Sequence, residues 1–118
     1  MELKDYLIEG SKQLGVHLED YQTEQFFQFK DLLLEWNNKI NLTAIVDDKE
    51  IIIKHFLDCL SIGQFFDCQT ACNVIDVGTG AGFPGIPLKI AYPNLKTTLL
   101  DSLNKRISFL KEVVLNLQ

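Results

Sequence analysis

The residues best suited to chemistry lie in one glycine-rich run, Asp76 to Gly85, which reads Asp-Val-Gly-Thr-Gly-Ala-Gly-Phe-Pro-Gly. Glycines at a turn from a strand into a helix let the backbone bend sharply and approach a bound ligand closely. Dinucleotides and S-adenosylmethionine both bind at such turns. The spacing Gly80-x-Gly82-x-x-Gly85 matches the dinucleotide fingerprint, but a single match is a weak signal.

Charge separates the two cofactor classes. Asp76 stands two residues before Gly78, where its carboxylate would repel the pyrophosphate of a dinucleotide. S-adenosylmethionine has no phosphate, and its sulfonium and amino groups are cationic. The pattern therefore predicts an S-adenosylmethionine site with Gly80 and Gly82 in the same loop.

Two further residues are candidates for cofactor contacts. Asp101 follows a second apolar run, and its carboxylate could accept hydrogen bonds from both ribose hydroxyls. The alternative for Asp101 is a helix cap shared with Ser102. Phe83 stands at the mouth of the loop, where its ring or its N–H could touch the ligand. Ordinary packing of the Phe83 ring beneath a helix is the equal alternative.

The elements that must position these residues follow from the apolar periodicity. Helices are expected over residues 2–14 and 20–37, and a third from Asp47 or Asp48 to Gly63. From residue 73 the pattern becomes strand, glycine loop, helix, strand, helix, with strands over 74–77 and 97–100, a helix over 84–92 and a last helix capped by Ser102. The order predicts a parallel α/β unit, with a helical segment over residues 1–72 and the start of a Rossmann-like domain over 73–118.

Two parallel strands cannot cover their own faces and edges. The sequence also reaches Gln118 inside an expected helix, without a stop signal. We therefore expect a truncated α/β fold that is catalytically inert by itself. Its exposed strand edges would favour association of two copies.

Composition narrows the class of protein. No apolar run approaches the roughly 18 residues of a membrane span, and the N-terminus is not that of a secretory signal, so a cytoplasmic location is expected. The net charge of −5 divides into −7 over residues 1–72 and +2 over 73–118, so the first segment is no basic RNA-binding arm. Cys59, Cys68 and Cys72 are expected to be buried thiols, in neither a disulfide framework nor a metal site.

The sequence resembles the bacterial small-subunit ribosomal RNA guanine-N7 methyltransferases, also called the glucose-inhibited division protein B family. The stretches that carry the match are Asn41 to Ile45, Lys54 to Asp58, Asp76 to Leu88, and Leu100-Asp101-Ser102 with Lys105-Arg106 and Phe109-Leu110. Cys59 departs from the family, which usually has serine there. The resemblance implies a Rossmann-like fold, S-adenosylmethionine as cofactor, and 16S ribosomal RNA or the small ribosomal subunit as partner. It also implies cofactor contacts at Gly78 and Phe83, with Gly80, Gly82, Asp76 and Asp101 around them.

The implied reaction transfers a methyl group to guanine N7, which has a free lone pair and no proton to lose. It needs orientation more than a general base, so no catalytic residue is assigned. For His55 and Asp58, three residues apart on one helix face, a structural hydrogen bond that docks the helical segment is preferred over a catalytic pair. Candidates for RNA contacts are Lys89, Lys105, Arg106 and Lys111, although a solvated helix face explains each one better individually.

Two other functions remain open at this stage. A nicotinamide-dependent oxidoreductase half-domain would bind NAD and not S-adenosylhomocysteine. A non-catalytic helical interaction module on a degenerate nucleotide fold would have lost its glycines, which are all present.

Overall fold

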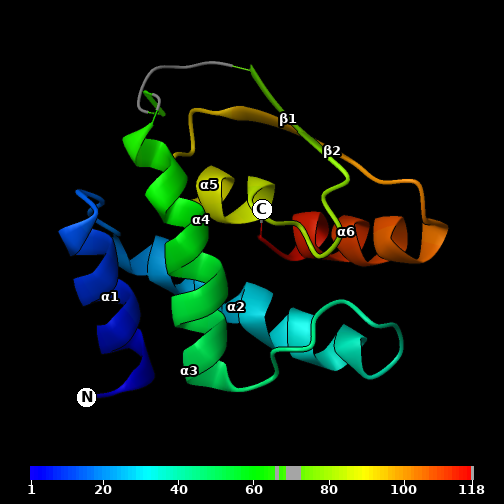
Figure 1. Cartoon of the computed structure of the whole chain (residues 1–118), viewed down its shortest axis with the longest axis horizontal. Helices are drawn as coiled ribbons and strands as arrows, with labels where there is room; N and C mark the ends of the chain where they lie inside the picture. The colour runs from blue at the N-terminus through cyan, green and yellow to red at the C-terminus, as the bar shows by residue number, and fades with distance from the viewer. Residues whose placement is uncertain (66, 69–72, 118) are drawn as a thin grey trace.

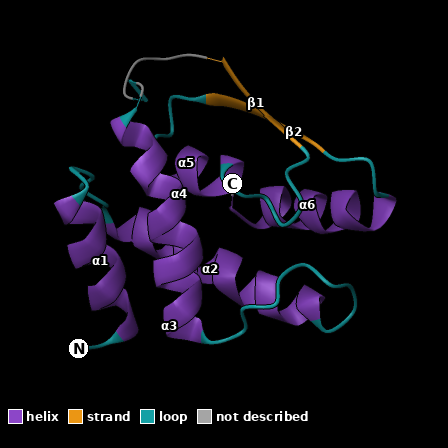
Figure 2. Cartoon of the chain, viewed as in Figure 1, coloured by secondary structure: helices purple, strands orange, loops and turns teal. Residues whose placement is uncertain are grey.

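The computed structural model describes residues 1–65, 67–68 and 73–117 as a set of helices on one side of a two-stranded sheet (Figures 1 and 2). The elements run α1 (Leu3–Gln13), α2 (Asp20–Asn37), α3 (Asp48–Glu50), η1 (Ile51–Leu57), α4 (Asp58–Ser61), η2 (Ile62–Gln64), β1 (Asn73–Val77), α5 (Gly85–Ala91), β2 (Lys96–Leu100) and α6 (Asn104–Leu117). The predicted order of elements is confirmed. Cys72 and Gln118, which the sequence analysis singled out, lie outside the described residues.

The helical segment is organised around α2. Its N-terminus is closed by a capping box, in which Gln22 accepts from the Glu19 N–H at 2.7 Å. The apolar residues of α2 recur at spacings of three and four along one face, where Phe26, Phe29 and Leu33 are fully buried and Trp36 is half-buried. Burial of these side chains fixes which face of α2 turns inward.

The third predicted helix is present but is not a regular α-helix. Asp47 caps it by accepting from the Glu50 N–H at 3.1 Å, as expected. From Ile51 to Leu57 the backbone forms π-helical turns, and the run ends in the short 3₁₀ turn η2. Three consecutive β-branched residues crowd a regular α-helix, and the wide turns begin at the first of these isoleucines. The periodicity located the helix but not its type.

The sheet is parallel, as predicted, and pairs Asn73 with Lys96 through to Val77 with Leu100. Burial alternates along both strands, because one face packs on α5 and α6 while the other is open (Figure 1). The open face exposes 62% of Ile75, 76% of Val77 and 48% of Leu100. Parallel sheets are normally covered on both faces, so this face has the character of an interior surface.

The predicted cap of the last helix is wrong. Helix α6 begins at Asn104, and the Leu103 carbonyl accepts the N–H groups of Arg106 and Ile107, both at 3.1 Å. Ser102 lies exposed before the helix. Asp101 instead accepts from the Leu103 N–H at 2.9 Å, and this hydrogen bond fixes the backbone one residue before α6.

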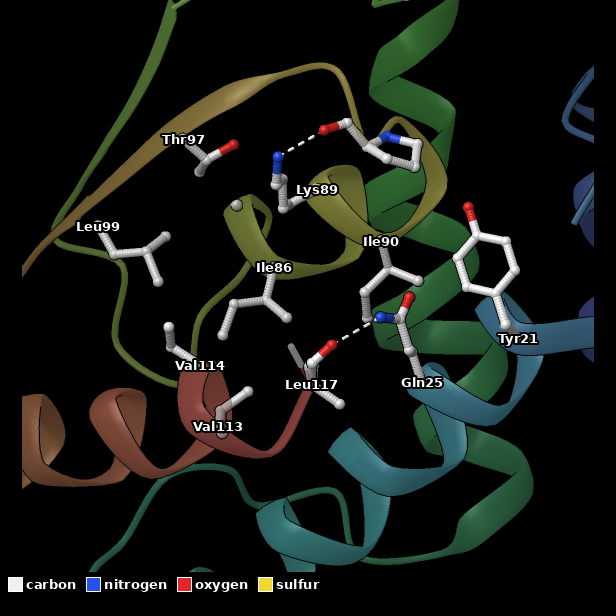
Figure 3. A pocket seen from close by; sticks show the side chains of 12 residues that line it. Tyr21, Gln25, Ile86, Lys89, Ile90, Thr97, Leu99, Val113, Val114 and Leu117 are labelled. Atoms are coloured by element: carbon white, nitrogen blue, oxygen red, sulfur yellow. Dashed lines mark hydrogen bonds between the residues drawn. The ribbon is translucent and has the colours of Figure 1, made fainter. Parts of the chain in front are cut away.

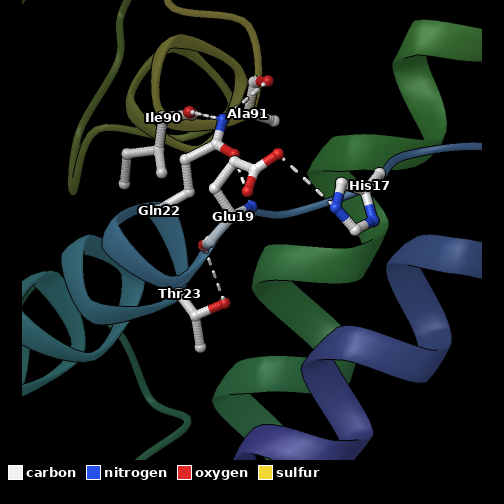
Figure 4. A network of polar contacts seen from close by, with 6 residues as sticks. All are labelled: His17, Glu19, Gln22, Thr23, Ile90 and Ala91. Atoms are coloured by element: carbon white, nitrogen blue, oxygen red, sulfur yellow. Dashed lines mark hydrogen bonds and ion pairs between the residues drawn. The ribbon is translucent and has the colours of Figure 1, made fainter.

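Gln22 joins the helical segment to the α/β unit (Figure 4). Its buried amide donates to the Ile90 carbonyl at 2.9 Å and to the Ala91 carbonyl at 3.2 Å. These carbonyls belong to the last turn of α5, which has no intrahelical donors for them. One side chain therefore caps the start of α2 and the end of α5.

Cys59 and Cys68 are buried, as predicted. Burial, helped by the nearby charges of Asp58 and Asp76, raises the pKa of the Cys59 thiol to about 12, which makes it unreactive. In the part of the chain that the structure describes, no three metal-binding side chains gather. No described helix combines the length and the apolar character that a bilayer span requires.

Replacing Gln22 by alanine is expected to lower the free energy of unfolding by about 2 kcal/mol, because two buried carbonyls and the cap of α2 lose their partner. The exposed Gln28→Ala on the same helix is the matched control and should cost less than about 0.5 kcal/mol. Urea denaturation measures both. Equal losses in the two variants would contradict the docking role of Gln22.

Candidate functional site

The turn from β1 into α5 is held by the carboxylate of Asp76. Its Oδ2 accepts from the Thr79 hydroxyl at 2.6 Å and from the Gly85 N–H at 2.9 Å. The side chain is half-buried on the inner face of the sheet. One oxygen thus ties the start of the glycine loop to its end, so Asp76 is not a solvated strand end.

Asp101 holds the middle of the same loop from the neighbouring strand. Its Oδ2 accepts from the Gly80 N–H at 2.9 Å and lies 3.5 Å from an Arg106 guanidinium nitrogen. Only 2% of its side chain is exposed. The N–H groups of Leu103 and Gly80, aided by the Arg106 charge, lower the pKa of Asp101 below its ordinary value.

The ends of both strands therefore meet at the loop. Gly78 and Thr79 donate their N–H groups to the Leu100 carbonyl at 2.8 and 3.0 Å. The carboxyl ends of parallel strands are where ligands bind in open α/β sheets. The structure brings together Asp76, Gly78, Gly80, Gly82 and Asp101, which the sequence singled out.

The glycines of the loop divide into two kinds. Gly82 has φ +95°, and a Cβ there would collide with the Ile86 side chain, so this position has no room. Gly78 at φ +69° and Gly80 at φ +60° are different, because a Cβ on either would meet no described atom within 4 Å. The open space above these two glycines is where a ligand could approach the backbone.

Phe83 packs into the helical segment. Its ring is stacked on His55, with centroids 4.5 Å apart and planes at 18°, and it also contacts Phe29 and Phe56. Its N–H donates to the Thr79 carbonyl at 3.2 Å. The packing alternative is therefore realised for Phe83, whose half-exposed ring still lies at the loop.

His55 bonds to Thr43 rather than to Asp58. Its Nε2 lies 2.8 Å from the Thr43 hydroxyl oxygen, while Asp58 is exposed. Burial lowers the pKa of His55, against the opposing effect of the Asp58 charge. The predicted docking hydrogen bond is wrong, because the bond to Thr43 lies within the helical segment; His55 reaches the glycine loop through its ring contact with Phe83 instead. Sequence reasoning missed Thr43 as an individual residue, although the stretch around it carried the family resemblance.

The basic residues proposed for RNA contacts are not equally available. The Lys89 ammonium donates to the carbonyls of Pro93 and Leu95, and Arg106 faces Asp101. Lys105 and Lys111 are exposed on α6. Lys89 and Arg106 are therefore already engaged in contacts within the fold.

A cavity of about 340 Å³ lies between α2, α5, α6 and β2 (Figure 3). Its lining is mostly apolar, and the Gln25 amide at its wall is occupied by the Leu117 carbonyl at 2.7 Å. A polar ligand needs several free, convergent polar groups. The glycine loop, and not this cavity, is the candidate functional site.

Comparison with known proteins identifies related sequences. A family model described as GidB, rRNA small subunit methyltransferase G, matches residues 22–118. A ribosomal RNA small subunit methyltransferase G of Alkaliphilus metalliredigens is 58% identical over 96% of the chain and 47% of its own length. One of Acetivibrio thermocellus is 56% identical over 97% of the chain and 47% of its own length. The chain spans about half the length of the curated relatives it matches.

Alanine substitution should separate the two kinds of glycine. Gly82→Ala is expected to destabilise the fold by several kcal/mol through the clash with Ile86 in addition to backbone strain. Gly80→Ala should cost about 1–2 kcal/mol from its left-handed backbone alone. Urea denaturation of both variants tests this, and equal losses would contradict the assignment of free space above Gly80.

The pKa of the Asp101 carboxyl should lie below the ordinary aspartate value when its side-chain carbon is followed by NMR. Because its folded-state pKa is lowered, its contribution to stability is complete above about pH 4. That contribution is lost as the pH falls through the lowered value. The difference in unfolding free energy between the unmodified chain and Asp101→Asn should shrink over that acid range. A difference that does not change with pH would contradict the lowered pKa of Asp101.

Proposed function

The chain belongs to the GidB family of ribosomal RNA small subunit methyltransferases G, and from that membership we propose that its full-length form methylates guanine N7 in 16S ribosomal RNA. S-Adenosylmethionine is the proposed cofactor, and it supplies the activated methyl group. The proposed substrate is the RNA within the small ribosomal subunit, and the proposed location is the cytoplasm.

The observation that carries the cofactor assignment is the glycine loop flanked by two carboxylates. Asp76 and Asp101 both bond to loop atoms, while the space above Gly78 and Gly80 is free of described side chains. The negative charge of Asp76 disfavours a pyrophosphate and favours a cationic ligand, whereas Asp101 would suit the ribose of either cofactor. An NAD-binding half-domain, the alternative from the Gly80-x-Gly82-x-x-Gly85 spacing, is disfavoured by the charge of Asp76.

Roles for individual residues follow from this geometry. Asp101 would accept the ribose hydroxyls in exchange for its bond to the Gly80 N–H. Asp76 would lie beside the cationic part of the ligand, and Gly78 would let it approach the backbone. Gly82 fixes the turn, and Phe83 forms the edge of the site. These residues bind and orient, which is what transfer to an unprotonated nitrogen requires.

The fold proposal is a truncated Rossmann-like methyltransferase, with the helical segment over residues 1–72 and the α/β start over 73–118. The parallel sheet with one open apolar face supports it. We propose that the 118-residue chain does not methylate RNA by itself, and that its free strand edges favour association with a second copy.

The test uses a full-length protein that contains this sequence, methyl-labelled S-adenosylmethionine and small ribosomal subunits lacking the modification. Label is expected at N7 of one guanine, and replacing Asp101 by alanine should reduce labelling at least tenfold. Gln28→Ala, exposed on α2, is the control and should leave the labelling unchanged. If the protein binds S-adenosylhomocysteine but transfers no label to the RNA, the cofactor assignment stands and the substrate assignment is rejected.

Binding of NAD in place of S-adenosylhomocysteine would reject both assignments. Isothermal titration with each compound decides this point independently of RNA.

A further inference from the structure

The glycine loop packs against the helical segment through the side chain of Phe83. Phe83 immediately follows Gly82, and its ring contacts His55, Phe29 and Phe56, which all belong to the helical segment. Of these contacts, the one with His55 is the closest and the nearest to parallel. The position of the Phe83 ring therefore depends on the position of the His55 ring.

His55 is itself held from a separate loop. The Thr43 hydroxyl oxygen lies 2.8 Å from His55 Nε2 and accepts from the Ile45 N–H at 3.1 Å. Asn37 Oδ1 accepts from the Thr43 N–H at 3.0 Å, which fixes the threonine backbone to the end of α2. The imidazole is thus oriented by a chain of hydrogen bonds that begins at α2.

The hydroxyl has one proton to donate. One lone pair of its oxygen accepts from Ile45, and if the hydroxyl proton is donated to His55 Nε2, the neutral imidazole carries its own proton on Nδ1. Burial lowers the pKa of His55, which keeps the ring neutral near pH 7. His55 also lies in the π-helical turns of η1, a backbone form that is frequent at functional sites.

We propose that His55 is a positioning residue. Its ring, oriented by Thr43, packs against Phe83 and so fixes the conformation of the glycine loop. Its bearing on the cofactor rests on the proposed function, because it assumes that this loop is the cofactor loop. The positioning itself does not depend on the identity of the ligand.

Amide hydrogen exchange on the 118-residue chain tests the positioning. The reporters are the loop amides bonded within the turn, Gly82, Phe83, Gly85 and Ile86, each measured against the strand amides of Asp76 and Thr98. His55→Ala should speed loop exchange relative to the strands by about two- to tenfold, as expected for loss of one aromatic pair. Thr43→Val should give a smaller change in the same direction, and Thr43→Ser should restore the original rates.

Two controls separate positioning from general destabilisation. Lys54→Ala, next to His55 but exposed, should change nothing. Ile52→Val removes a buried methyl group from η1 and should speed loop and strand amides by the same factor. The same uniform factor in His55→Ala would overturn the proposal. If His55→Ala does not fold, Thr43→Val and its serine rescue decide.

Two further measurements extend the test. Nitrogen NMR of His55 should show the Nδ1–H form in the unmodified chain and an altered tautomer balance in Thr43→Val; an Nε2–H form in the unmodified chain would overturn the orientation by Thr43. The affinity for S-adenosylhomocysteine should fall in step with loop loosening. A loosened loop with unchanged affinity would uphold the positioning role and reject the loop as the cofactor site.

Discussion

The turn between β1 and α5 is rich in glycine, so its shape depends on a few side chains that bond or anchor it. Asp76 ties its two ends, Asp101 holds Gly80 from the neighbouring strand, and Phe83 anchors it in the helical core. Glycine makes the close backbone approach sterically available, at the cost of conformational entropy. The carboxylates and the aromatic ring offset that cost, so the same residues that would meet a ligand also build the site.

The helical segment and the α/β unit share one core. Phe29 of α2 contacts Phe83 in the loop and Phe109 in α6, and Gln22 caps the end of α5. The change at residue 73 is therefore a change in chain pattern and not a break in packing. A continuous set of buried contacts therefore connects α2 with the loop.

The sequence was sufficient for the order of elements, the parallel pairing and the gathering of Asp76, Asp101 and the glycines. These follow from local periodicity and from the rule that parallel strands end at one edge. It was insufficient for the type of the third helix and for the cap of the last one. The apolar periodicity does not distinguish the π-helical turns of η1 from an α-helix, and α6 begins at Asn104 after Asp101 has accepted from the Leu103 N–H, so Ser102 is not the cap. His55 bonds to Thr43 and not to Asp58 because of the conformation of the loop between α2 and α3, and the apolar periodicity of the sequence does not predict loop conformations.

The distribution of charge limits what this part of the fold can do with RNA. Its helical segment carries a net −7, and both Lys89 and Arg106 are bonded within the α/β unit. Each phosphate contact requires an available cation, and of the four candidates Lys105 and Lys111 are the exposed ones without a described hydrogen bond or ion pair. The described half is thus better suited to holding a small cationic ligand than a polyanion. In the proposed function, the attraction for RNA has to come mainly from the portion of the longer relatives that this chain does not span.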